Sequence, residues 1–109
     1  MARTIRWTES ATSDLEEAAE FITRDSRFYA AALVRETQEA AQSLKSLAER
    51  GRRVPEINAS DIRELFIRNY RLIYQTMDER IFILAFVHSA RDLTALWKRR
   101  GNNPQEMSP

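Results

Sequence analysis

The run Ile81–Val87 is apolar at every position. Because successive side chains of a β-strand point to opposite faces, a strand with this sequence must be covered on both sides. It lies within an extended segment, Arg80–His88, which the polar pair Asp78–Glu79 separates from a second extended segment, Tyr70–Met77. A short polar link between two such segments predicts an antiparallel hairpin. A third segment, Ile62–Arg68, precedes them, and Asn69 is predicted to lie in the turn that joins it to the second. The second half of the chain therefore predicts a small antiparallel sheet.

The first half predicts one short strand and two helices. Residues 3–7 alternate between polar and apolar side chains, as expected of a strand. Thr8 is a suitable N-cap for a helix whose apolar positions, Ala11, Leu15, Ala18 and Ile22, form one stripe. A second amphipathic helix is predicted over 27–50, after a break at Asp25 or Ser26, and Gly51 is a suitable residue to end it. Because the link is short, the two helices are predicted to form an antiparallel hairpin.

The predicted order is β-α-α-β-β-β, with a last helix capped by Asp92 and running through Trp97 and Lys98. This order predicts an α+β fold in which the helix hairpin packs on one face of a small, mainly antiparallel sheet. Residues 52–60 are predicted to be a loop. A length of 109 residues predicts one domain, over 1–100, and a frayed tail over 101–109.

Two helices cover only one face of such a sheet. Alternation would place Phe82, Leu84 and Phe86 on one side, and it would place Ile81, Ile83 and Val87 on the other. One hypothesis is that part of the second face is an exposed apolar patch, of the kind that marks a binding site. The other is that residues 92–100 fold back over it. The sequence leaves both open.

Composition excludes several classes of chemistry. The chain has no cysteine, and its only histidine is His88, so disulfides, thiolate sites and multi-histidine metal sites are excluded. We predict no metal and no cofactor. His88 and Ser89 are neighbours on a strand and point to opposite faces, which disfavours a Ser-His-Asp triad. No segment is long and apolar enough for a membrane helix, and the start lacks the apolar region of a secretory signal, so the cytoplasm is the expected location.

A basic and aromatic cluster on the predicted sheet remains as a candidate site. Its members are Arg63, Arg68, Arg71, Tyr74, His88, Arg91, Trp97, Lys98, Arg99 and Arg100. Arginines beside aromatic rings bind phosphates and stack on bases, and a histidine can act as a general acid. The alternative is structural, with Arg63 paired to Glu64 or Asp61, Arg71 packed at the edge of a strand, and His88 satisfied within a turn. A net charge of only +1 argues against a plain nucleic-acid-binding module.

Several stretches at their spacings resemble the ParE branch of the ParE/RelE superfamily, the toxins of type II toxin–antitoxin operons. They are Trp7 with Asp14 and Leu15, Ala30 and Ala31, 52–56 (RRVPE), 62–65 (IREL), 70–74 (YRLIY) and 83–92 (ILAFVHSARD). The resemblance covers about residues 3–97. It implies the fold predicted above, a ParD-like antitoxin that covers sheet and helix surfaces, and membership of a plasmid-stabilisation type of module. It also implies DNA gyrase as the target, which such toxins bind and do not hydrolyse.

Relatives of the RelE branch instead cut mRNA on the ribosome, using strand arginines and a C-terminal tyrosine. In this chain Arg71 and Arg91 lie at or near the matching positions, and the C-terminal aromatic is Trp97, which has no ionisable hydroxyl. This leaves His88 for proton transfer, which disfavours a ribonuclease but keeps it as the alternative. The residues predicted to contact an antitoxin or target are the basic and aromatic cluster together with Phe82 and Leu84. Acidic antitoxin residues are the predicted partners of the arginines.

Overall fold

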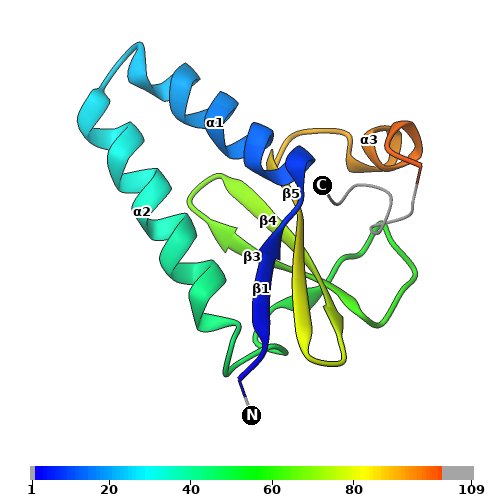
Figure 1. The fold of residues 1–109 in the computed structure, drawn as a ribbon. Helices are drawn as coiled ribbons and strands as arrows, with labels where there is room; N and C mark the ends of the chain where they lie inside the picture. The colour runs from blue at the N-terminus through cyan, green and yellow to red at the C-terminus, as the bar shows by residue number, and fades with distance from the viewer. Residues whose placement is uncertain (1, 102–109) are drawn as a thin grey trace.

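In the computed structural model, which describes residues 2–101, three helices flank a five-stranded sheet (Figure 1). The elements are β1 (Thr4–Trp7), α1 (Glu9–Thr23), α2 (Arg27–Ser43), β2 (Arg52–Arg53), β3 (Ile62–Ile67), β4 (Tyr70–Met77), β5 (Arg80–His88) and α3 (Leu93–Arg99). The predicted α+β class, the helix hairpin and the order of the main elements are confirmed.

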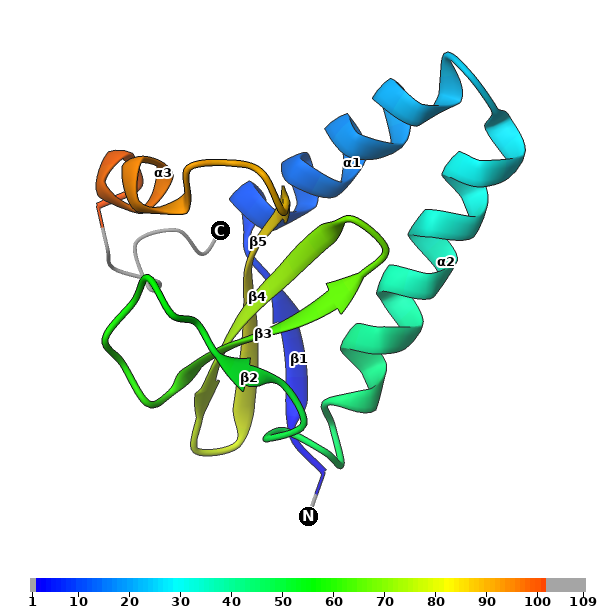
Figure 2. The same ribbon diagram turned by 180° about the vertical axis from the view of Figure 1, so that it is seen from behind.

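The strands lie in the order β1-β5-β4-β3-β2, with β1 parallel to β5 and the other neighbours antiparallel. The fifth strand, β2, comes from a segment that the sequence predicted as loop, 52–60. It contains only Arg52 and Arg53, and it forms the edge of the sheet opposite β1 (Figure 2). Because β5 has a neighbour on each side and cover on each face, it has the continuous apolar sequence of a buried strand.

Side-chain caps start the helices as predicted. The Thr8 hydroxyl accepts a hydrogen bond from the amide of Ala11 at 3.1 Å, and the Ser26 hydroxyl accepts one from the amide of Tyr29 at 3.1 Å. The second helix, however, ends at Ser43 and not at Arg50. The turns that follow bind the sheet, because the Tyr74 hydroxyl donates to the Ala48 carbonyl at 2.8 Å. A helix continued in a straight line would carry this segment past the sheet.

The helix hairpin packs on one face of the sheet, as predicted (Figure 1). Between the hairpin and the sheet lies a first hydrophobic cluster. It joins Ala11 and Leu15 of α1 to Leu33 of α2 and to Leu72 and Ile83 of the strands. Removing apolar surface from water is the dominant favourable term in folding, at about 25 cal/mol per Å².

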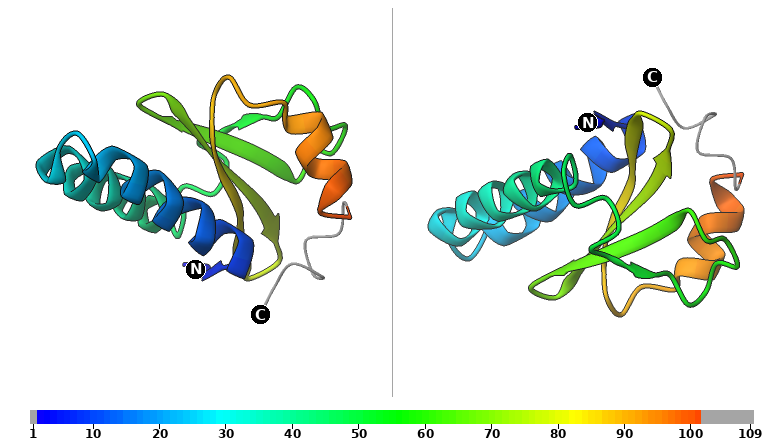
Figure 3. Two further views of the ribbon diagram at one scale, coloured as in Figure 1. Left: turned by 90° about the horizontal axis from the view of Figure 1, so that it is seen from above. Right: turned by 90° about the horizontal axis from the view of Figure 1, so that it is seen from below.

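The second face is also covered, so the hypothesis of an exposed apolar patch there is wrong. Leu93, Leu96 and Trp97 of α3 pack against the sheet in a second cluster, and the segment 54–59 completes the cover from the side (Figure 3). The alternative, in which residues 92–100 fold back, is the correct one. Leu84 is fully buried in this cluster, and Phe82 packs against it half-buried.

A register shift in β5 also changes the predicted faces. Ile73 pairs with Ala85 and the next residue, Tyr74, pairs with Ile83, so Leu84 is the extra residue of a β-bulge. Beyond the bulge the alternation is reversed. Phe86 therefore lies in the first cluster with Ile83, and not with Leu84 as simple alternation predicted.

The end of the chain follows α3, whose N-cap is Asp92 as predicted. Gly101 lies in the turn after this helix with a φ of 85°, and residues 102–109 of the predicted tail lie outside the described residues. Within residues 2–101, no helix combines the length and the apolar character that a membrane crossing requires.

Candidate functional site

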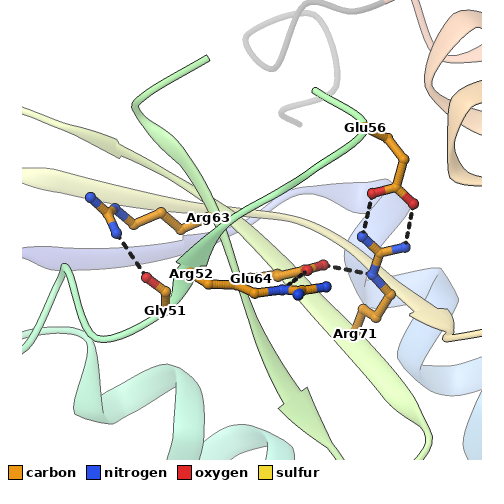
Figure 4. A network of polar contacts seen from close by, with 6 residues as sticks. All are labelled: Gly51, Arg52, Glu56, Arg63, Glu64 and Arg71. Atoms are coloured by element: carbon orange, nitrogen blue, oxygen red, sulfur yellow. Dashed lines mark hydrogen bonds and ion pairs between the residues drawn. The ribbon is translucent and has the colours of Figure 1, made fainter. Parts of the chain in front are cut away.

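Arg71 lies at the centre of a network of ion pairs on the face covered by α3 (Figure 4). Its two terminal nitrogens donate to the Glu56 carboxylate at 2.8 and 2.7 Å, and its Nε donates to Oε1 of Glu64 at 2.6 Å. The other Glu64 oxygen accepts from Nε of Arg52 at 2.7 Å. Glu64 is fully buried and Arg71 is 5% exposed. The buried cation is therefore matched by two carboxylates.

The local sequence explains this arrangement. The register partner of Glu64 is Ile73, two residues from Arg71, so Glu64 and Arg71 lie on the same face of neighbouring strands. Arg52 is paired directly with Glu64 across β2 and β3. Glu56 comes from the segment that leaves β2. The hydrogen bonds from Arg71 hold the pKa of the Glu56 carboxyl below its usual value. The same bonds raise the pKa of Arg71. The network thus fastens the 54–59 segment to the sheet. The structural alternative predicted for Arg71, packing at the edge of a strand, does not hold, because Arg71 is paired with two carboxylates.

Two of the three residues that a nuclease would need, Arg71 and His88, lie on opposite faces of the sheet. Arg71 pairs with Val87 on the face covered by α3, whereas His88 pairs with Tyr70 on the helix-hairpin side. The His88 ring meets the Tyr70 ring edge-on at 5.4 Å, and its Nδ1 accepts a hydrogen bond from the amide of Ala90 at 3.1 Å. This agrees with the structural interpretation of His88 as a residue satisfied within a turn.

Arg91 follows His88 in the turn after β5, and its amide donates to the His88 carbonyl at 2.9 Å. It lines a shallow cleft of about 350 Å³ between α1 and α3, together with Glu9, Glu17 and Arg99. Positive and negative side chains are mixed along this cleft, so it favours neither anions nor cations. Within residues 2–101, no three histidine, aspartate or glutamate side chains cluster closely enough to hold a metal ion.

Two further arginines of the predicted site are paired inside the chain. Arg68 lies in the β3–β4 turn with a φ of 54°, and its guanidinium binds Glu36 of α2 at 3.0 and 2.7 Å. This contact lowers the pKa of the Glu36 carboxyl. Arg100 binds Asp14 of α1 at 3.0 and 2.7 Å. Lys98 and Arg99 are exposed on α3.

The remaining members of the predicted site are held by the fold. Trp97 is buried in the second cluster. Tyr74 is buried in the first, and burial raises the pKa of its hydroxyl. Arg63 does not pair with Glu64 or Asp61. Its Nη1 instead donates to the carbonyl of Gly51 at 2.8 Å (Figure 4).

An exposed aromatic group that was not predicted from the sequence lies where α1 and α2 meet. We call Phe21, Arg24, Phe28 and Tyr29 the hairpin tip. The exposed fractions of Phe21, Phe28 and Tyr29 are 63%, 79% and 56%. Arg24 lies over the Phe21 ring at 5.9 Å. A signal was present, because Phe28 and Tyr29 precede the apolar stripe of α2 that begins at Ala30, so the stripe gives them no place in the core.

The hairpin tip has the composition of a protein-binding surface. Aromatic residues and arginine are enriched among the side chains that carry most of the energy of protein–protein binding. The tip also projects away from the sheet at the far end of the hairpin (Figures 1 and 2). A partner can therefore reach it without displacing α3 or the strands.

The model of a family described as the ParE toxin of the type II toxin–antitoxin system parDE matches residues 5–93. No curated protein sequence matches significantly.

Two solved structures have a similar fold. A chain of the chromosomal ParDE system from P. aeruginosa is 19% identical, with a TM-score of 0.66 over 80% of this chain and 96% of that one. A chain of the toxin–antitoxin complex RelBE2 from Mycobacterium tuberculosis is 23% identical, with a TM-score of 0.55 over 84% of this chain and 95% of that one. At these identities the two likenesses concern the fold.

Proposed function

Because this chain belongs to the ParE toxin family of type II toxin–antitoxin systems, we propose that it binds and inhibits DNA gyrase and that a ParD-like antitoxin neutralises it. The activity requires contact with a protein and no bond cleavage by the toxin. The family assignment supplies the toxin role. The choice of target depends on the chemistry that the chain's own side chains permit.

One observation carries the choice of binding over catalysis. Arg71 is the strand arginine that matches the nuclease position. Its Nε and both terminal nitrogens already donate hydrogen bonds to Glu64 and Glu56. An RNA phosphate would have to displace a carboxylate from a nearly buried cation. His88, the only candidate for a general acid, lies across the sheet from Arg71. This arrangement supports a toxin that acts by contact.

The hairpin tip is the surface that we assign to the target. Phe21, Phe28 and Tyr29 are exposed and belong to neither hydrophobic cluster. Single exposed apolar residues are common, but a group of three large rings is unusual for a surface without a partner. Gyrase is a large protein, and the projecting tip offers it an accessible contact.

The test is a supercoiling assay with purified gyrase, relaxed plasmid and free toxin. Inhibition at a stoichiometric ratio, relieved by the antitoxin, is the expected result. Unchanged supercoiling at a large molar excess of folded toxin would reject gyrase as the target. The alternative, a RelE-like ribonuclease, predicts new mRNA ends on translating ribosomes, which primer extension detects. In that case Arg71→Ala and His88→Ala would abolish toxicity while antitoxin binding survived.

A further inference from the structure

Two arginines face each other at the edge of the sheet with no carboxylate between them. Arg53 of β2 is the direct register partner of Arg63 of β3. Directly opposed side chains on antiparallel strands lie on the same face about 4.5–5.5 Å apart at Cβ, and like charges there are destabilising. None of the ion pairs within residues 2–101 includes Arg53 or Arg63.

The neighbouring arginine of β2 and the arginine of β4 are paired differently. Arg52, Arg68 and Arg71 each have a carboxylate partner, and Arg100 has one in Asp14. Figure 4 shows the division, because Arg63 extends away from the Arg52–Glu64 contact, toward Gly51. Across β2 and β3, Arg52 therefore faces a carboxylate, whereas Arg53 and Arg63 face each other on the opposite side.

The neighbourhood of the pair is also positive. Arg50 lies beside Gly51, and its Nη1 donates to the hydroxyl of Ser43 at 2.7 Å. Arg50 and Arg63 both lie close enough to the Tyr74 hydroxyl to lower its pKa, against the larger effect of burial, while Glu49 acts in the opposite sense. Arg50 and Arg63 thus share this neighbourhood with one exposed glutamate, Glu49. Asp61, which precedes β3, accepts a hydrogen bond from the Gln75 side chain at 2.7 Å.

The backbone around Arg63 is fixed before any ligand arrives. The Gly51 amide donates to the Tyr74 hydroxyl at 3.0 Å, and the same hydroxyl donates to Ala48. A side chain at position 51 has no room, since its Cβ would lie 2.6 Å from the Glu64 carbonyl and from the Tyr74 hydroxyl. The position of Gly51, whose carbonyl accepts the Arg63 hydrogen bond, is therefore fixed by the Tyr74 hydroxyl. A preorganised guanidinium loses less entropy on binding.

We propose that Arg53 and Arg63, with Arg50, form a docking site for an acidic segment of the antitoxin at the β2 edge of the sheet. The inference rests on the antitoxin partner of the proposed function and not on gyrase. Carboxylates match the guanidinium fork, and an edge strand leaves its outer side open to an extended segment. Charge complementarity supplies the argument for the occupant, since none of the three arginines has a carboxylate partner within residues 2–101.

The decisive variant is Arg53→Glu, because it places a carboxylate directly opposite Arg63. We expect this variant to raise the thermal stability of the chain and to lower its affinity for the antitoxin. The thermal midpoint rises by a few degrees, since an opposed like-charge pair becomes an opposed ion pair. The affinity for the antitoxin falls about tenfold at low salt, and the difference shrinks at high salt. A purely structural role for Arg53 would lower the midpoint and leave antitoxin affinity unchanged.

Controls separate this site from general charge effects. Arg80→Glu changes the same charge at an exposed position at the start of β5 and is expected to leave antitoxin affinity within about twofold. Arg53→Gln removes the positive charge without adding a negative one. It should raise the thermal midpoint and lower the antitoxin affinity by smaller amounts than Arg53→Glu.

A single-stranded dT oligonucleotide serves as a second probe. Antitoxin affinity that is equal for the wild type and Arg53→Glu overturns the proposal. So does a loss of oligonucleotide binding with unchanged antitoxin affinity. Because gyrase enters none of these measurements, failure in the supercoiling assay leaves this test intact.

Discussion

The guanidinium of Arg100 donates two hydrogen bonds to the Asp14 carboxylate, at 2.7 and 3.0 Å, and so joins the end of α3 to α1. Oδ2 of Asp14 also accepts from the backbone amide of Phe86 in β5 at 3.0 Å. One carboxylate therefore connects α1, β5 and the residue that follows α3. It holds in place the helix that covers the second face of the sheet.

Replacement of that carboxylate tests its role. Asp14→Ala should lower the free energy of unfolding by about 2–3 kcal/mol, because it removes charged hydrogen bonds and leaves a strand amide without its partner. Urea denaturation measures the change, and hydrogen exchange should show earlier opening of α3. Glu17→Ala, at an exposed position on the same helix, should change stability by less than about 0.5 kcal/mol. Equal effects of the two variants would contradict the assignment.

The buried pair of Glu64 and Arg71 should be costly to break from one side only. Glu64→Gln leaves the nearly buried Arg71 with Glu56 alone, and we expect a loss of about 3 kcal/mol in urea denaturation. The double variant Glu64→Leu with Arg71→Met removes both charges, and Arg52 and Glu56 retain access to water. It should be more stable than Glu64→Gln. A single variant that is as stable as the wild type would show that the pair contributes nothing.

The Glu56–Arg71 contact predicts a pH dependence. The pKa of Glu56 in the folded chain lies below its ordinary value of 4.5, chiefly because of the hydrogen bonds from Arg71. A depressed carboxyl pKa contributes stability that is fully present above the unfolded value and is lost as the pH falls through the folded value. The stability difference between the wild type and Glu56→Gln should therefore be constant above about pH 5 and shrink below pH 4.5. Thermal melts across pH 3–7 measure it, and a difference independent of pH would contradict the mechanism.

The sequence predicted the fold because its local signals agree with one another. Thr8 and Asp92 cap their helices, Asp78 and Glu79 form the hairpin turn, and the apolar strand lies where cover exists on both faces. The early end of α2 was not predictable from periodicity. The segment after Ser43 is held by a contact between Tyr74 and Ala48, which lie far apart in the sequence. The bulge at Leu84 has a similar origin, because register depends on the neighbouring strand.

The candidate site was less predictable because residue type does not reveal pairing. Arg63 and Arg71 carry the same guanidinium group, yet Arg71 binds two carboxylates and Arg63 binds a backbone carbonyl. Register and burial decide between these outcomes, and both are properties of the folded chain. His88 and Arg71 looked compatible in the sequence, although the pleat puts them on opposite faces.

The assignment of the hairpin tip to the target gives the last prediction. Phe28→Ser changes the most exposed large hydrophobic side chain of the described residues, and phenylalanine and serine have similar helix propensities. Stability should stay within about 0.5 kcal/mol of the wild type. Inhibition of gyrase supercoiling should weaken about tenfold, the effect of losing a binding residue worth about 1.4 kcal/mol.

Leu47→Ser is the matched control for this variant. Leu47 is 58% exposed but lies in the turns after α2, at the opposite end of the hairpin. It should leave inhibition unchanged, and both variants should bind the antitoxin like the wild type. If Phe28→Ser inhibits gyrase as well as Leu47→Ser does, the hairpin tip is not the contact. If Phe28→Ser loses antitoxin binding instead, the exposed rings belong to the neutralising interface, and the target must contact another surface.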